Sequence, residues 1–237
     1  MKGLLFAIAV AALLATPQTP ATATVKGRVR LSGVPPGNPI IRMGVDPRCA
    51  AINRGKRIVQ ETVITTLDGG LANVFVHLSG SFQQTPPASG VVSIDQRSCL
   101  FVPRVIGARV GQTIEFRNSD KTLHDVHSLS TKGSVFNVGQ PIAGMVYRVQ
   151  FEKPEVMVHI KCDVHRWMNT YIGVVDHPYF TVSGGDGTFT IAGVPPGVYT
   201  IQSWHEQYGT LTQDVIVHAG DNPIADVTYT GLEKPGR

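Results

Sequence analysis

The sequence predicts an all-β fold, a β-sandwich or a pair of them, and three observations support that prediction. Short segments in which apolar and polar residues alternate with a period of two follow one another along the chain. The 237 residues include 25 glycines and 16 prolines and only 16% charged residues, a composition typical of turn-rich β proteins. No long segment with the 3.6-residue period of a helix occurs after the N-terminal leader.

The predicted strands are spread over the whole chain that follows the leader. Turns rich in Gly, Pro, Asn and Asp separate them, among them Asp186-Gly187, a dipeptide favoured in two-residue hairpins. The clearest strand segments are residues 24–31, 72–78, 112–116, 146–151, 156–162, 188–191 and 198–201. Many short strands with frequent turn signals are typical of β-sandwiches.

The N-terminus has the features of a signal peptide, residues 1–23. Lys2 provides a positive charge, residues 4–14 are apolar, and residues 21–23 read Ala-Thr-Ala, an A-x-A cleavage site. The alternative is an uncleaved membrane anchor, but the apolar run is short for a spanning helix. We therefore expect an exported, periplasmic protein that is not stably inserted in the membrane after cleavage, since no later stretch is long and apolar enough to span.

Three cysteines in an exported chain leave one without a partner. Cys49 and Cys99 lie in loop-like contexts near strand ends, and an oxidising compartment would favour a disulfide between them. Cys162 would then be free, and it is the cysteine surrounded by potential metal ligands.

The net charge of +4 is small and its cations are scattered, so we expect no nucleic-acid partner.

The segment 162–168 combines three residue types that bind copper. Cys162 ends an alternating strand, so we expect its side chain to face inward, and His165 and Met168 follow within one tight loop. Thiolate and thioether ligands suit Cu(I), and imidazoles suit Cu(II). The sequence therefore predicts one copper ion that changes between the two states. Met168 is the axial candidate, with a core methionine as the alternative reading.

A second histidine for this site is expected from the upstream loop, residues 118–127. Its spacing from Asn118 favours His124, whereas His127 is either an alternative ligand or a residue that supports the site. His205 follows a strand near the C-terminus and is a further possible ligand if the two sandwiches pack closely. A type 1 copper site needs the combination of thiolate, two imidazoles and a weak axial ligand.

Residues 91–178 resemble the cupredoxin family. The resemblance lies in the strand and Asn118 before His124, in the Cys-x2-His-x2-Met loop, which is like that of amicyanin, and in the strand that follows Met168. It implies a Greek-key β-sandwich, a type 1 copper site and a redox protein partner, such as a cytochrome or a periplasmic oxidoreductase. The ligand set that it implies is His124, Cys162, His165 and Met168.

Two acids depart from the family pattern. Asp125 stands where the family usually has an asparagine that ties the two ligand loops together, and a carboxylate cannot donate those hydrogen bonds unless it is protonated. Asp163 follows the cysteine directly. Negative charge beside the metal is expected to favour Cu(II) and to lower the reduction potential.

The two ends of the chain resemble a different module, the carboxypeptidase regulatory-like, transthyretin-like β-sandwich. The motif Gly-Val-Pro-Pro-Gly at residues 33–37 recurs at residues 193–197, between two predicted strands. The resemblance implies that residues 24–90 and 179–237 form one small sandwich interrupted by the copper domain, residues 91–178. A tandem order is the alternative arrangement.

Electron transfer is the function that this combination favours. The alternatives are copper handling without a redox cycle and a glycan- or protein-binding module. We expect no enzyme activity, because the His-x-His pairs of multicopper oxidases and a second cysteine in the ligand loop are absent from the sequence. Chains of this type resemble bacterial proteins labelled methylamine-utilisation proteins, which implies a periplasmic partner.

Overall fold

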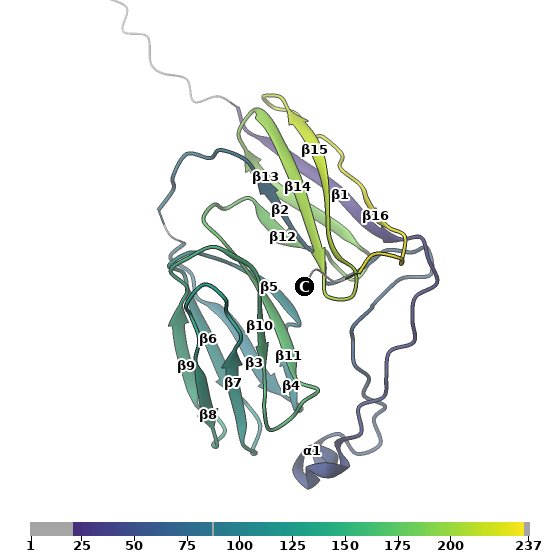
Figure 1. The fold of residues 1–237 in the computed structure, drawn as a ribbon, viewed down its shortest axis with the longest axis vertical. Coiled ribbons are helices and arrows are strands. Elements are labelled where there is room, and N and C mark those ends of the chain that lie inside the picture. Colours follow the sequence, from purple (N-terminus) through teal and green to yellow (C-terminus); the bar gives the residue numbers. More distant parts are fainter. Residues whose placement is uncertain (1–20, 87, 235–237) are drawn as a thin grey trace, which may run out of the picture.

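The computed structural model describes residues 21–86 and 88–234, which form two β-sandwiches, one above the other in Figure 1. The predicted all-β fold class is confirmed, since the described residues contain sixteen strands and two short helical segments. Of the predicted signal peptide, residues 1–20 lie outside the described residues, and the first strand begins at Ala23. The described residues contain no helix with the length and apolar character needed to cross a bilayer.

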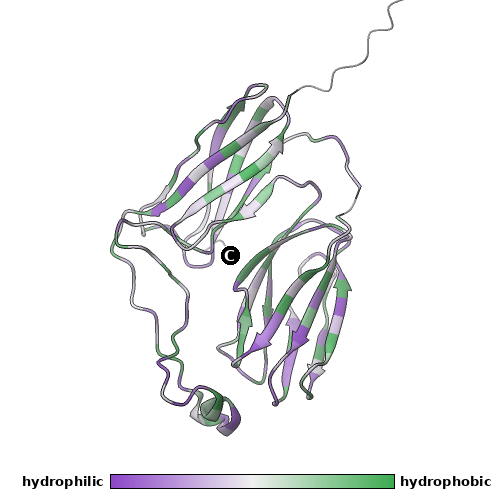
Figure 2. Cartoon of the chain, turned by 180° about the vertical axis from the view of Figure 1, so that it is seen from behind, coloured by the Kyte–Doolittle hydropathy of each residue, from purple (hydrophilic) through white to green (hydrophobic). Residues whose placement is uncertain are grey.

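The first sandwich combines both ends of the described chain. One sheet has the order β13-β1-β16 and the other β12-β2-β14-β15, and one core cluster joins the two sheets. Buried residues alternate with less buried ones along β14, and hydrophobic and hydrophilic bands alternate along strands in Figure 2. Its strands are β1 (Ala23–Leu31), β2 (Phe75–Ser79), β12 (Phe180–Val182), β13 (Thr188–Val194), β14 (Gly197–His205), β15 (Gly209–Val217) and β16 (Val227–Tyr229).

The second sandwich is formed by the middle of the chain. Its sheets have the orders β5-β11-β10-β7-β8 and β4-β3-β6-β9, and a second core cluster lies between them. Its strands are β3 (Val92–Arg97), β4 (Leu100–Val102), β5 (Val105–Arg109), β6 (Thr113–Asn118), β7 (His124–Ser128), β8 (Asn137–Gln140), β9 (Val146–Gln150), β10 (Glu155–Lys161) and β11 (Asn169–Val175).

A small apolar interface joins the two sandwiches. Phe75 on β2 is fully buried against β11, where Gly173 leaves room for its ring, because a Cβ at that position would overlap it. Arg104 and Glu206 form a two-pronged ion pair across the interface, with both N–O distances at 2.8 Å. Their side chains are only 13% and 7% exposed, so the pair is largely shielded from water.

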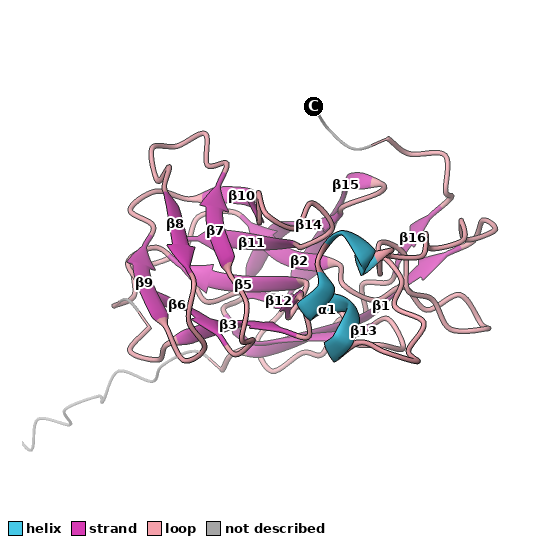
Figure 3. Ribbon diagram, turned by 90° about the horizontal axis from the view of Figure 1, so that it is seen from below, coloured by secondary structure: helices cyan, strands magenta, loops and turns pink. Residues whose placement is uncertain are grey.

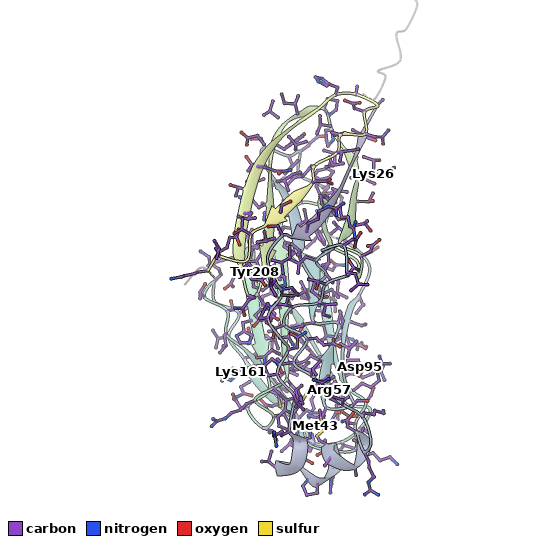
Figure 4. The ribbon with its side chains drawn as sticks, turned by 90° about the vertical axis from the view of Figure 1, so that its right-hand side faces the viewer. Lys26, Met43, Arg57, Asp95, Lys161 and Tyr208 are labelled. Atoms are coloured by element: carbon purple, nitrogen blue, oxygen red, sulfur yellow. A yellow bond between two sulfur atoms is a disulfide. The ribbon has the colours of Figure 1, made fainter. Side chains whose placement is uncertain are left out.

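The connection from β1 to β2 leaves the first sandwich and reaches the far end of the second. It carries the 3-10 helix η1 (Met43–Val45) and the helix α1 (Pro47–Ile52). Lys26 on β1 and Met43 in η1 accordingly lie toward opposite ends of the molecule (Figure 4). Seen from below, α1 lies across this end, in front of the strands (Figure 3).

The helix α1 corrects one local expectation, that Cys49 lies in a loop-like context. The Asp46 carboxylate caps the helix by accepting hydrogen bonds from the backbone N–H groups of Arg48 and Cys49, and Pro47 takes the first helical position. Cys49 therefore lies in a helix and not in a loop. The predicted Cys49–Cys99 disulfide is confirmed, and Cys162 is the free cysteine of the chain.

Candidate metal centre

Strand pairing brings the two predicted ligand loops together. Strand β10 pairs antiparallel with β7, with Lys161 opposite His127, so the chain that continues beyond Lys161 runs along β7 toward its first residue, His124. Strand β10 also forms a hairpin with β11, and residues 162–168 are its connection. Cys162, the residue directly after β10, is buried, and so are Val158 and Ile160 within the strand. This confirms the prediction that the Cys162 side chain faces inward.

The loop that follows Cys162 is closed by its own backbone. The Cys162 N–H donates to the carbonyl of Met168 (3.1 Å), and the Met168 N–H donates to the carbonyl of His165 (2.8 Å). The His165 N–H points to the Cys162 Sγ atom at 3.4 Å. Met168 is fully buried in the same core cluster as Cys162. These bonds hold the positions of the three side chains relative to one another.

The loop before His124 is fixed by two buried polar side chains. Asn118 donates through Nδ2 to the carbonyls of Thr122 (3.0 Å) and Gln140 (2.7 Å), and its Oδ1 accepts from the Asp120 N–H (2.9 Å). Asp120 in turn accepts from His124 Nε2 at 3.0 Å. The asparagine that the sequence singled out therefore shapes the turn, and Asp120 orients the histidine.

Three of the four predicted ligands converge in the interior. The Nδ1 atoms of His124 and His165 lie 3.0 Å apart, and the Cys162 Sγ atom lies 3.8 Å from His165 Nδ1. All three ligand atoms lie within 4.8 Å of one another, and each side chain is at most 1% exposed. Burial of this kind excludes water from the site.

Two carboxylates determine which ring nitrogen of each histidine faces inward. His124 Nε2 lies 3.0 Å from Asp120 Oδ2, and His165 Nε2 lies 2.9 Å from Asp46 Oδ2. An ionised carboxylate only accepts, so each Nε2 must carry the proton, and a neutral imidazole then has a lone pair on Nδ1. With both rings neutral, two lone pairs and a cysteine sulfur face one another without a proton between the rings. A cation satisfies this arrangement.

Both carboxylates are held in their ionised form. Burial raises the pKa of Asp120, but hydrogen bonds from His124 and from the N–H groups of Cys99 and Ser98 outweigh it, and the pKa is lowered overall. Burial likewise raises the pKa of Asp46, while bonds from the Cys49 N–H and from His165 bring it below its usual value. The sequence alone did not indicate either residue.

The Cys162 thiol is protonated in the metal-free protein at neutral pH. Burial is the main reason that its pKa is raised, to about 12, and the neighbouring Asp125 carboxylate adds to the effect. A metal that binds here must therefore displace the proton, which makes binding dependent on pH. Soft thiolate and imidazole donors in a buried, preformed pocket suit copper, so the residues fit the metal that the sequence predicts.

Asp125 ties the two ligand loops together, but by accepting rather than donating. Its Oδ1 accepts from the backbone N–H groups of Asp163 (2.9 Å) and Val164 (3.2 Å) and from the Cys162 thiol (3.2 Å). Its Oδ2 is buried and has no hydrogen-bond partner among the described residues. An acid can therefore link the loops where an asparagine was expected.

The remaining candidates lie outside this cluster. His127 faces the partly exposed side of β7, where its Nδ1 bonds to Asp163 Oδ2 at 2.8 Å. His205 lies in the first sandwich and stacks on Tyr208 with ring centroids 4.9 Å apart. Burial lowers the pKa of His205 to about 4, so its ring is neutral at physiological pH.

No family model and no curated protein sequence matches the chain. Solved structures that it resembles include cupredoxins and a copper-containing nitrite reductase. A mutant of amicyanin with Cu(I) shares 18% identity at a TM-score of 0.32, covering 37% of this chain and 84% of that one. A purple cupredoxin from Nitrosopumilus maritimus shares 20% identity at a TM-score of 0.31, covering 35% of this chain and 98% of that one. A copper-containing nitrite reductase from Thermus scotoductus SA-01 shares 25% identity at a TM-score of 0.31, covering 39% of this chain and 25% of that one. Similarities with TM-scores this low carry no argument about function.

Proposed function

We propose that the protein carries single electrons by means of one copper ion bound by His124, Cys162 and His165, with Met168 as the axial ligand. The observation that supports this most is the orientation of the histidines, whose Nε2 atoms are bonded to carboxylates while their Nδ1 atoms face each other at 3.0 Å beside the thiol. A bound metal cation satisfies such a set of donors.

Copper, when bound, supplies a one-electron couple between Cu(I) and Cu(II). The chain supplies the rigid surroundings. Cys162 gives up its proton, the hairpin backbone holds Cys162, His165 and Met168, and Asp125 joins this hairpin to the loop of His124. The burial of the ligands favours electron transfer over copper delivery, since a site that passes its metal to another protein needs exposed ligands.

Optical spectroscopy of the copper-loaded protein tests this function. The protein with Cu(II) should show an intense visible thiolate-to-copper band, which Cys162→Ala and His124→Ala should lose or strongly change. His127→Ala is the matched control, because this histidine bonds to Asp163 on the surface and not to the cluster. A colourless wild-type protein that takes up Cu(II), or a band that survives in Cys162→Ala, would contradict the proposal.

The proposed partner is an exported redox protein, such as a cytochrome or a periplasmic oxidoreductase, and the proposed compartment is the periplasm. The leader in residues 1–23 supports export, and the Cys49–Cys99 disulfide fits an oxidising compartment. We propose a carrier and not an enzyme, in line with the sequence motifs.

We also propose that residues 91–178 form a copper domain inserted into a regulatory-like sandwich made of residues 24–90 and 179–237. The sheet membership supports this organisation. Strands β1 and β2 share their sheets with β12 to β16, whereas β3 to β11 pair only with one another among the described strands. An inserted domain keeps both of its ends close together, which leaves the host sandwich free to close.

A further inference from the structure

The outer edge of His165 is covered by a segment from the other part of the chain. This segment, which we call the cap, is residues 43–53 and comprises η1, Asp46, α1 and Asn53, the residue that ends α1. It belongs to the connection between β1 and β2, two strands of the first sandwich (Figure 1). The ligand loops, by contrast, belong entirely to the second sandwich.

Several independent contacts fasten the cap to the metal end of the second sandwich. The Cys49–Cys99 disulfide joins α1 to the turn between β3 and β4. Asn53 donates to the carbonyl of Ser98 at 3.0 Å, and Arg48 donates to the carbonyl of Lys121 at 3.0 Å. Met43 is buried in the core cluster that contains Cys162. The cap is therefore packed against the sandwich as a part of its core.

Asp46 uses its two carboxylate oxygens for two different purposes. Oδ1 caps α1 by accepting from the N–H groups of Arg48 (2.8 Å) and Cys49 (3.0 Å). Oδ2 accepts from His165 Nε2 at 2.9 Å. The helix thus fixes the carboxylate, and the carboxylate fixes the histidine ring.

The cap and the ligand hairpin enclose the imidazole between them. The Cys49 Sγ atom lies 3.5 Å from His165 Nε2. The Trp167 ring lies on another side, with its centroid 5.0 Å from that of His165, and its Nε1 donates to the Cys99 carbonyl at 2.9 Å. His165 is only 1% exposed as a result.

We propose that the cap is a working part of the metal centre: Asp46 is a positioning residue that holds His165 with Nδ1 toward the metal, and the cap closes the outer edge of His165 to solvent and to partners. The inference rests on the proposed copper function. A carboxylate bonded to a ligating histidine fixes the orientation of the ring and makes it a stronger donor. Asp46 therefore strengthens metal binding and favours Cu(II) over Cu(I).

The positioning role is tested with Asp46→Ser, because serine also caps helices well but is too short to keep the second contact. We expect the affinity for copper to fall about 10- to 100-fold and the reduction potential to become more positive. Asp163→Asn is the control, since it removes a carboxylate beside Cys162 that bonds to Lys161 and His127, both outside the proposed ligand set. If Asp46→Ser folds poorly, Asp46→Asn offers the same test with a side chain of the same size.

An affinity and a potential that change no more in Asp46→Ser than in Asp163→Asn would refute the positioning role, even if the thermal stability falls. A wild-type protein without the thiolate-to-copper band would instead refute the copper function on which the inference rests. The two failures are thus distinguishable.

The closure is tested in the metal-free protein, by reaction with diethyl pyrocarbonate and peptide mass spectrometry. His165 should remain unmodified in the wild type while the exposed His218 reacts, and it should react in Cys49→Ala/Cys99→Ala, where the cap is no longer cross-linked. Modification of His165 in the wild type as fast as that of His218 would overturn the closure. Protection that persists both in the double variant and in Asp46→Ser would overturn the role of the cap.

Discussion

Replacement of Asp120 by asparagine should weaken both the fold and the metal site. Asp120 is 6% exposed, and its two oxygens accept from His124 Nε2 (3.0 Å), the Cys99 N–H (2.7 Å) and the Ser98 N–H (2.8 Å). In Asp120→Asn, one acceptor oxygen becomes an NH2 group that faces a donor. The loss of one charge-assisted bond costs about 1.5–3 kcal/mol, and a buried donor without a partner costs about 1–3 kcal/mol more. We expect a total loss of about 2.5–6 kcal/mol in the free energy of unfolding.

Chemical denaturation of the metal-free protein measures this loss, with Asp163→Asn as the control. The Asp163 side chain is 41% exposed, and surface pairs of this kind contribute at most about 1 kcal/mol.

The pH dependence of the free energy of unfolding adds a second readout. Because the pKa of Asp120 is lowered in the folded state, its contribution is complete above the usual aspartate pKa, about 4, and is lost as the pH falls below that value. The difference between wild type and Asp120→Asn should therefore shrink in acid. A loss at pH 7 no larger than that of the control would refute the reasoning.

Three further predictions concern the first sandwich and the interface. The pKa of His205 falls from 6.5 to about 4 because the ring is buried, so its contribution to stability is complete above pH 6.5 and declines as the pH falls toward 4. Acid denaturation should reveal a loss of about 3 kcal/mol that is absent in His205→Leu; an identical pH profile of the two proteins would contradict this. Gly173→Ala places a methyl group against the ring of Phe75 and should cost about 1–3 kcal/mol, seen as a lower melting temperature, whereas an unchanged melting temperature would show that the ring can move aside. Arg104→Met leaves the buried Glu206 carboxylate unpaired and should cost about 3–5 kcal/mol in denaturant unfolding, most of which the addition of Glu206→Leu should restore; equal stability of the single and double variants would argue against it.

The convergence of His124, Cys162 and His165 could be predicted because their arrangement is local. Cys162 and His165 lie three residues apart in one hairpin connection, and His124 begins the neighbouring strand. A strand pattern and a short loop therefore contain most of the information that brings these donors together. The Cys49–Cys99 disulfide was predicted from the odd number of cysteines and from the expected oxidising compartment, because Cys162 was assigned to the metal site.

The carboxylates behind the ligands could not be predicted in the same way. Asp46 is separated from His165 by 119 positions, and the contact depends on the path of a long connection with little secondary structure of its own. Helix α1 has six residues, too few for a helical period to appear in the sequence. The one local signal was Asp46 before Pro47, which is typical of the first turn of a helix. For Asp125 the situation is reversed. The sequence identified its position between the two ligand loops, but only the structure shows that its carboxylate accepts the hydrogen bonds that join them.

The most direct test of the central claim is a reductive titration of the protein loaded with one Cu(II) per chain, followed by its visible absorption. The account predicts an intense thiolate-to-copper band that disappears when ascorbate has delivered one electron per copper, and that returns in air. A band that does not return, a reduction that releases the metal, or bound Cu(II) without the band would contradict a buried one-electron site formed by His124, Cys162 and His165.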